Sequence, residues 1–209
     1  VRMPELDPAY RATTRLEEVN QGLTVEMAMR EAQRCLDCKN PSCVEGCPVN
    51  INIPGFIKQI EKGEFIEAAR ILKQTSALPA VCGRVCPQEK QCESRCIHHK
   101  MNSQPVAIGY LERFAADYER ESGQTVLPEM AASNGIKVAV VGSGPSGLSF
   151  AGDMAKNGFD VYVFEALHEI GGVLKYGIPE FRLPNRIVEA EIDNLRKMGV
   201  HFQTDVIIG

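Results

Sequence analysis

The first half of the chain repeats apolar residues every three or four positions, which is the spacing of amphipathic helices. The hydroxyl of Thr24 is suited to cap the first of these helices. The apolar stripe that follows consists of Val25, Ala28, Met29, Ala32 and Leu36. We expect this helix to deliver Cys35 and Cys38.

Further helices are predicted along the first half of the chain. Residues 54–76 read as two helices divided at Gly63, and Pro54 suits a first turn. Another helix is expected from about Val106 to Glu119. Between these segments, residues 82–96 predict a loop with short helical pieces.

The second half changes to short apolar runs that alternate with helical patterns. Residues 136–142, IKVAVVG, are a β-branched run typical of a buried strand. A helix over 145–156, a strand over 160–165 and a helix over 185–198 follow, and residues 200–209 start another strand pair. This order predicts a parallel sheet with a right-handed crossover.

These patterns together predict a multidomain chain. We expect an N-terminal all-α domain over residues 1–130. Residues 131–209 then predict the first part of a doubly wound, Rossmann-like α/β domain.

Composition and charge narrow the classes of function. The 209 residues are 44% hydrophobic and 24% charged, with a net charge of −4 and no basic block, so nothing indicates a nucleic-acid partner. No apolar run has the length of a membrane span. Residues 1–10 lack the apolar centre of a signal peptide. We therefore expect a cytoplasmic protein, in a reducing compartment where structural disulfides are rare.

All eight cysteines lie in two groups within residues 35–96. Their spacings are C-x2-C-x4-C-x3-C-P in Cys35, Cys38, Cys43 and Cys47, and C-x3-C-P-x4-C-x3-C in Cys82, Cys86, Cys92 and Cys96. The Cys-Pro pairs are similar to the bacterial ferredoxin motif, in which the cysteine before proline ligates the other cluster. Two such groups predict two [4Fe–4S] clusters with exchanged ligands. A zinc site or a disulfide scaffold is the alternative.

One carboxylate on the last predicted helix of the first half is a further candidate ligand. Glu112 shares a helix face with Ile108 and Ala115. A carboxylate on an apolar stripe is costly unless it is paired or ligated. The alternative is a position at the edge of the surface, where Glu112 pairs with an arginine.

The first strand–helix unit of the second half carries a dinucleotide-binding fingerprint. Gly142, Gly144 and Gly147 form G-x-G-x-x-G after a strand, and Glu165 follows Gly142 by 23 residues. The glycines permit a tight turn, close approach to a pyrophosphate, and helix packing, and helix N–H groups face the phosphates. Glu165 would accept the ribose 2′-OH and repel a 2′-phosphate, which favours FAD or NAD over NADP.

Downstream residues add to this site. Gly171 and Gly172 allow close backbone approach to a flavin, and Arg182 would meet a phosphate or the flavin edge, or else form a surface salt bridge. No catalytic side chains are predicted, because no nucleophile–base arrangement is found. We interpret the histidines as incidental, since they lack metal-ligand spacing; they are His98, His99, His168 and His201.

Five stretches together resemble the small (beta) subunit family of NADPH-dependent glutamate synthase. They are RCLDCKNPSCVEGCPVNINIPGFI, CGRVCPQEKQCESRC, VAIGYLERF, VAVVGSGPSGLSFA and GGVLKYGIPEFRLP. The family's relatives include the flavin subunit of NADH-dependent ferredoxin–NADP oxidoreductase and the N-terminal part of dihydropyrimidine dehydrogenase.

The resemblance implies how the ligands divide, with Cys82 as a non-ligand. One cluster would take Cys35, Cys38, Cys43 and Cys96, and the other Cys47, Cys86, Cys92 and Glu112. FAD would contact Gly142, Ser143, Gly144, Pro145, Ser146, Glu165, Gly172, Val173, Leu174 and Arg182.

The resemblance also implies an oxidoreductase that takes a hydride from NAD(P)H onto FAD and passes electrons singly, through the clusters, to a partner flavoprotein. In the glutamate synthase type this partner is the large (alpha) subunit. The alternatives are a transhydrogenase flavin subunit, a pyrimidine-reducing enzyme and a non-catalytic metal-binding scaffold. The family's second, NAD(P)H-binding Rossmann domain is absent from these residues. We therefore expect an N-terminal portion that does not oxidise NAD(P)H by itself and holds FAD weakly or not at all.

Overall fold

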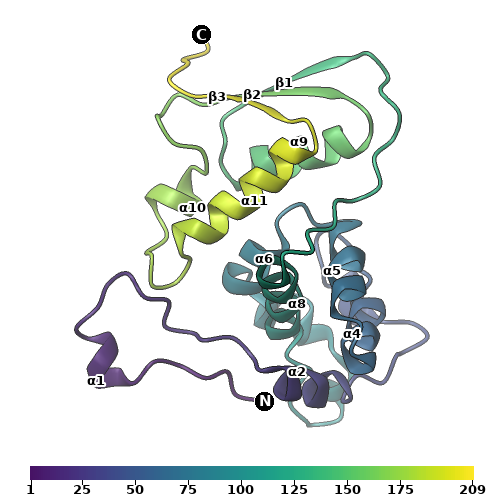
Figure 1. Ribbon diagram of the computed structural model, residues 1–209. Coiled ribbons are helices and arrows are strands. Elements are labelled where there is room, and N and C mark those ends of the chain that lie inside the picture. The colour runs from purple at the N-terminus through teal and green to yellow at the C-terminus, as the bar shows by residue number, and fades with distance from the viewer. The chain divides into compact units, whose positions relative to one another are not determined.

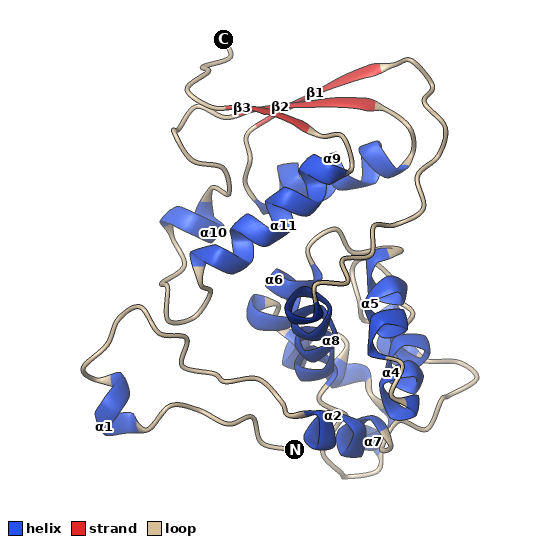
Figure 2. Ribbon diagram, in the orientation of Figure 1, coloured by secondary structure: helices blue, strands red, loops and turns tan.

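The computed structural model describes all 209 residues, which divide into two compact units (Figure 1). The helical unit comprises Val1–Pro8 and Val19–Val126. The sheet unit comprises Ala9–Glu18 and Leu127–Gly209. Figure 2 shows helices and loops in the first unit and all the strands in the second. The predicted order, an all-α region followed by an α/β region with a parallel sheet, is confirmed.

The helical unit is built from seven α-helices and two single 3₁₀ turns. The helices are α2 (Val25–Ala32), α3 (Ser42–Glu45), α4 (Ile53–Lys62), α5 (Phe65–Lys73), α6 (Pro79–Val85), α7 (Ile97–Lys100) and α8 (Ile108–Ser122), and the turns are η1 (Gln88–Lys90) and η2 (Glu93–Arg95). The long helix α8 packs against α2, α4, α5 and α6. The fully buried side chains of its core include Phe56, Ile57, Ile60, Leu72 and Leu111.

Local capping explains where these helices begin and end. The Thr24 hydroxyl accepts a hydrogen bond from the Met27 N–H at 3.3 Å, as the N-cap of α2. Asn52 caps α4 in the same way, and Gly63, with φ 82°, ends it. The Thr24 cap was predicted from the sequence because it acts within three residues, whereas the Asn52 cap was not predicted.

Three of the predicted boundaries are wrong. Helix α2 ends at Ala32, and Leu36 is 56% exposed, because the chain leaves the helix there and winds around a cavity. Cys82 lies inside α6 rather than in a loop. Helix α8 begins at Ile108 and ends at Ser122, where Gly123 adopts φ 71°.

A buried ionic network joins α6 to α8. The Arg84 guanidinium donates to Asp117 at 2.7 Å, and Arg113 and Arg120 donate to the same carboxylate. Burial alone would raise the pKa of Asp117, but its pairing with Arg84 and Arg120 outweighs this and lowers the pKa below its ordinary value. The ionised form of Asp117 therefore stabilises the folded unit.

Replacing Asp117 by asparagine should lower the free energy of unfolding at pH 7 by about 2–3 kcal/mol, because buried guanidinium groups lose their counter-charge. A carboxylate with a lowered folded pKa contributes stability above its unfolded pKa of about 3.9, and this is lost as pH falls through the folded pKa. Urea unfolding of wild type and Asp117→Asn at pH 7 and pH 3 measures the difference. An equal difference at both pH values would contradict the ionic account.

The sheet unit has three parallel strands in the order β1-β2-β3. These are β1 (Lys137–Val141), β2 (Asp160–Phe164) and β3 (His201–Gln203), and the helices are α1 (Pro8–Arg11), α9 (Pro145–Lys156), α10 (Val173–Tyr176) and α11 (Asn185–Lys197). Strand β1 pairs with β2 so that Val140 lies opposite Val163. Helices α9 and α11 pack against each other and lie on one side of the sheet (Figure 1).

Two predictions about the strands are wrong. The first strand is not buried on both faces: Val140 is 7% exposed, whereas Val141 is 67% exposed. This follows because the helices cover only one face of the sheet. The predicted strand pair at residues 200–209 forms only β3, and Ile207 lies in coil, 82% exposed.

Candidate metal centres and dinucleotide site

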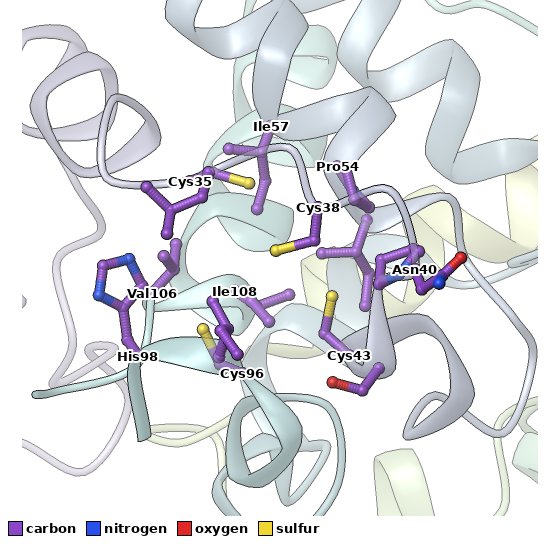
Figure 3. Close-up of a pocket in the computed structure, with 15 residues that line it drawn as sticks. Cys35, Cys38, Asn40, Cys43, Pro54, Ile57, Cys96, His98, Val106 and Ile108 are labelled. Carbon is purple, nitrogen blue, oxygen red and sulfur yellow. The ribbon is translucent and has the colours of Figure 1, made fainter. Parts of the chain in front are cut away.

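Four cysteines surround a cavity in the helical unit (Figure 3). Its volume is about 100 Å³. The loop after α2 carries two of these residues, α3 carries the third, and the fourth lies between η2 and α7; they are Cys35, Cys38, Cys43 and Cys96. In Figure 3 the four sulfur atoms face a common space. We call these residues the first cysteine set.

The rest of the cavity wall is mostly apolar. Ile53, Pro54 and Ile57 line it from α4, and Val106 and Ile108 line it from the start of α8. Every cysteine of the chain is a free thiol in the structure. The sulfur atoms surround a space, and no three potential ligands converge closely enough to hold a single ion. Four thiols around one space are a ligand set that both an iron–sulfur cluster and a zinc ion use.

The thiols of the first set influence one another electrostatically. Burial, and then the neighbouring thiols of Cys96 and Cys35, raise the pKa of Cys43 to about 11. Burial also raises the pKa of Cys35. Thiols with raised pKa values close to one another favour a cationic group among them, because it stabilises the thiolates and displaces their protons.

The other four ligands that the family resemblance implies influence one another electrostatically, and we call them the mixed set. It consists of Cys47, Cys86, Cys92 and Glu112. Burial, and then the charges of Glu112 and Cys47, raise the pKa of Cys86 to about 11. The pKa of Cys92 is raised further, by burial and then by Glu93 and Glu112. Glu112 is 5% exposed on α8, so its carboxylate lies in the interior as the apolar stripe predicted.

The expectation that the remaining cysteine, Cys82, is a non-ligand stays a prediction. Cys82 lies in α6, one turn before Cys86, and its backbone carbonyl accepts a hydrogen bond from the Gln88 side chain at 2.9 Å. The first cysteine set thus combines cysteines from both sequence groups around one cavity.

Two glutamates that the sequence analysis missed hold the start of α8. The Ala107 N–H donates to Glu31 at 2.9 Å, and the Gly109 N–H donates to Glu93 at 3.1 Å. These two carboxylates take the place of a local N-cap, because the N-cap residue of α8 is Ala107, whose methyl side chain cannot accept a hydrogen bond from the first N–H groups. Glu31 lies on α2 and Glu93 follows Cys92, so both fix the helix that carries Glu112. Sequence separations of 76 and 16 residues leave no local signal of such contacts.

His98 also has a role that its spacing did not indicate. Its side chain lines the cavity of the first cysteine set, and its Nε2 atom lies 2.8 Å from the Arg34 carbonyl oxygen. The interpretation of His98 as incidental to metal binding and catalysis stays a prediction.

The dinucleotide fingerprint folds into a tight turn between β1 and α9. Gly142 follows β1 with φ 94°, a conformation that favours glycine, and Gly144 is the N-cap of α9. A Cβ atom at Gly147 would lie 2.1 Å from the Gly142 carbonyl oxygen. A Cβ atom at Gly172 would lie 2.8 Å from the Cα atom of Gly144. The two glycine-rich segments therefore pack backbone to backbone.

A buried hydrogen-bond network ties these segments together. Ser143 is fully buried, and both its N–H and its hydroxyl donate to one carboxylate oxygen of Glu165. The Gly171 N–H donates to the same hydroxyl at 3.0 Å, and the Leu167 N–H donates to the other Glu165 oxygen. Burial opposes ionisation of Glu165, but these donors outweigh it and lower its pKa. Glu165 thus anchors the loop, and its expected contact with a ribose stays a prediction.

The other predicted contact residues differ in their exposure. Pro145 and Ser146 open α9, where backbone N–H groups point out of the helix. Val173 is 55% exposed, whereas Leu174 is 2% exposed and packs into the core. Arg182 lies in the exposed segment before α11. Leu174 can therefore reach a ligand only through its backbone.

Comparison with known proteins identifies both units. The family model described as dihydropyrimidine dehydrogenase domain II, 4Fe-4S cluster, matches residues 11–124, which is more than half of the chain. The chain belongs to this family. A second model, described as NAD(P)-binding Rossmann-like domain, matches residues 140–199. The chain therefore has an N-terminal iron–sulfur domain, which an NAD(P)-binding Rossmann-like domain follows.

Curated relatives support the same assignment. NAD-dependent dihydropyrimidine dehydrogenase subunit PreT of Escherichia coli K12 is 38% identical over 194 residues, which are 93% of this chain and 47% of the relative. Glutamate synthase (NADPH) small chain of Azospirillum brasilense is 33% identical over 208 residues, 100% of this chain and 43% of the relative. The small chain of E. coli K12 is 38% identical over 196 residues, 92% of this chain and 40% of the relative.

The resemblance to the glutamate synthase small subunit is therefore confirmed at the level of the family. The chain spans less than half the length of these relatives. None of its helices combines the length and the apolar character that crossing a bilayer requires.

Proposed function

We propose that the chain is the electron-transfer module of an NAD(P)H-dependent oxidoreductase of the glutamate synthase small-chain type. It would bind two [4Fe–4S] clusters in the helical unit and FAD in the sheet unit. The observation that carries the proposal is the cavity lined by four cysteines, Cys35, Cys38, Cys43 and Cys96. The iron–sulfur and Rossmann-like family matches support it.

Each set would hold one cluster. The first cysteine set offers four thiolates around an apolar cavity, which fits a cluster that requires four soft ligands and little water. The mixed set offers three thiolates and the Glu112 carboxylate. A carboxylate oxygen in place of a thiolate changes the charge and softness of the ligand set, so the two clusters would differ in reduction potential.

The sheet unit would hold the dinucleotide at the start of α9. Gly142 and Gly144 let the backbone approach a pyrophosphate, and the first N–H groups of α9 would donate to it. The buried Ser143–Glu165 pair keeps this loop in shape. The groups available to the rest of FAD are the exposed Pro145, Ser146, Val173 and Arg182 and the half-buried Gly172, with Leu174 contributing its backbone.

When bound, FAD supplies exchange between hydride and single electrons, and the clusters supply one-electron carriers. The protein residues position these groups and exclude water from them. The partner that receives electrons would be a large glutamate-synthase-type subunit or another flavoprotein. We expect a cytoplasmic, reducing location, in which cysteines stay without disulfide bonds, as they do here.

A second candidate function, electron supply to a pyrimidine-reducing enzyme, is favoured by the 38% identity to the dihydropyrimidine dehydrogenase subunit of E. coli. The same two ligand sets and dinucleotide site would serve it, and only the partner would differ. Purified large glutamate synthase subunit and purified dihydropyrimidine dehydrogenase catalytic subunit, each mixed with the chain carrying reduced clusters, distinguish the two by which one oxidises the clusters.

Metal analysis of anaerobically purified protein tests the cluster proposal. We expect about eight iron and eight acid-labile sulfide per chain, because two cubane clusters each contain four of both. Zinc without sulfide would overturn the proposal and support the metal-binding scaffold. Flavin in the same preparation, measured by absorbance after denaturation, tests the dinucleotide part separately.

A further inference from the structure

The contacts of His98 lead to an inference that rests on the proposed function. We propose that His98 is a positioning residue that holds the segment carrying Cys96 against the segment carrying Cys35, and so sets the geometry of the first cysteine set.

The two cysteines come from distant parts of the chain. Cys35 follows α2, and Cys96 directly precedes α7, which contains His98. The ring of His98 lines the cavity beside them, and its Nε2 atom makes the 2.8 Å contact with the carbonyl oxygen of Arg34 (Figure 3). A carbonyl oxygen only accepts, so the proton of this hydrogen bond is on Nε2. The bond joins the residue before Cys35 to the second residue after Cys96.

Arg34, whose carbonyl oxygen accepts this bond, is held in place by its own side chain. The Arg34 guanidinium donates to the buried carboxylate of Glu31 and to the carbonyl oxygen of Pro105 at 3.2 Å, and it also contacts Gln104. Residues 104–105 precede Val106 and α8, which form another wall of the cavity. His98 and Arg34 therefore link the three segments that enclose the first cysteine set.

Such a contact matters because a cluster needs four sulfur atoms at defined positions. Groups that orient ligands without touching the metal typically change metal affinity about 10–100-fold when they are removed. Loss of the His98 bond would let the α7 segment move relative to Cys35. Cys92 of the mixed set and Cys96 lie at opposite ends of η2, and no residue of the mixed set lies on α7 with His98, so we expect its retention of metal to depend less on His98.

The chain offers a matched control in the neighbouring residue. His99 is exposed on the same short helix and does not line the cavity. The test compares wild type, His98→Leu, His98→Gln and His99→Leu, all purified anaerobically as the full chain. A glutamine side chain can donate from its amide to the Arg34 carbonyl, whereas leucine cannot.

The measurement is the rate of iron transfer to a ferrous chelator, together with the reduction potential and electron paramagnetic resonance spectrum of each cluster. For His98→Leu we expect about four of the eight irons to leave at least about tenfold faster than in wild type, with a changed spectrum and potential for that cluster alone. His98→Gln should restore most of the wild-type rate. His99→Leu should behave as wild type.

Three results would overturn the inference. His98→Leu could release iron at the wild-type rate, it could release all eight irons faster to the same extent, or His98→Gln could match the leucine variant. Wild-type protein without iron and sulfide would instead overturn the proposed function, and this inference with it. If wild type and His99→Leu contain the clusters and the clusters of His98→Leu are unaltered, the inference about His98 is wrong but the proposed function stands.

Discussion

Replacing Glu112 by alanine should release the iron of one cluster and leave the other in place. Glu112 is 5% exposed, and its charge acts on Cys86 and Cys92. In the proposed mixed set it is the single oxygen ligand, and alanine offers no replacement. We expect iron to fall from about eight to about four per chain, with the signal of the first cysteine set retained.

The chain supplies controls for this experiment. Glu112→Gln keeps a carbonyl oxygen at the same position and should retain more iron than alanine. Cys86→Ala should mimic Glu112→Ala, whereas Cys82→Ala, one turn earlier on α6, should retain all the iron. If Glu112→Ala holds as much iron as wild type, or if Cys82→Ala loses half of it, the assignment of the mixed set is wrong.

The sequence was most informative where contacts are local. Helical periodicity, the Thr24 and Asn52 caps, and Gly63 with its positive φ act within a few residues, and the corresponding helices form. The cysteine spacing likewise indicated two groups and a role for Pro48 and Pro87. That Cys96 lies with Cys35 was implied by the family resemblance and not by the spacing, because that neighbourhood depends on how α3, α7 and the start of α8 pack.

The sequence predicted the strands but not which of their residues are exposed. A β-branched run such as residues 136–142 indicates a strand, but its exposure depends on what covers each face of the sheet. Here α9 and α11 cover one face, so Val140 is buried and Val141 is exposed. No pattern within the strand distinguishes these two valines.

Long-range polar contacts were the least predictable features of the site. Glu31 and Glu93 cap α8 from other elements, and His98 reaches Arg34 across 64 residues. Each replaces or supplements a local contact with one that exists only in the folded chain. His98 lines the cavity of the first cysteine set, and Glu31 and Glu93 hold the start of α8, yet no local pattern in the sequence indicated these contacts.

Two glycines of the fingerprint should respond differently to substitution by alanine, because an added methyl group would clash with the backbone at one and meet open space at the other. A Cβ atom at Gly147 would lie 2.1 Å from the Gly142 carbonyl oxygen, whereas a Cβ atom at Gly144 would meet nothing within 4 Å. Gly147→Ala therefore forces a backbone clash, and we expect it to destabilise the sheet unit by about 3 kcal/mol. Gly144→Ala should fold with nearly wild-type stability.

The two variants separate folding from dinucleotide binding. A methyl group at Gly144 would occupy the space through which a pyrophosphate approaches the loop, so Gly144→Ala should weaken FAD binding about 10–100-fold without lowering the thermal midpoint. Gly147→Ala should lower both. Thermal unfolding and FAD titration of the purified chain measure these effects. Wild-type FAD affinity in Gly144→Ala would mean that this loop does not hold the pyrophosphate, because the only change made there is the closure of that space.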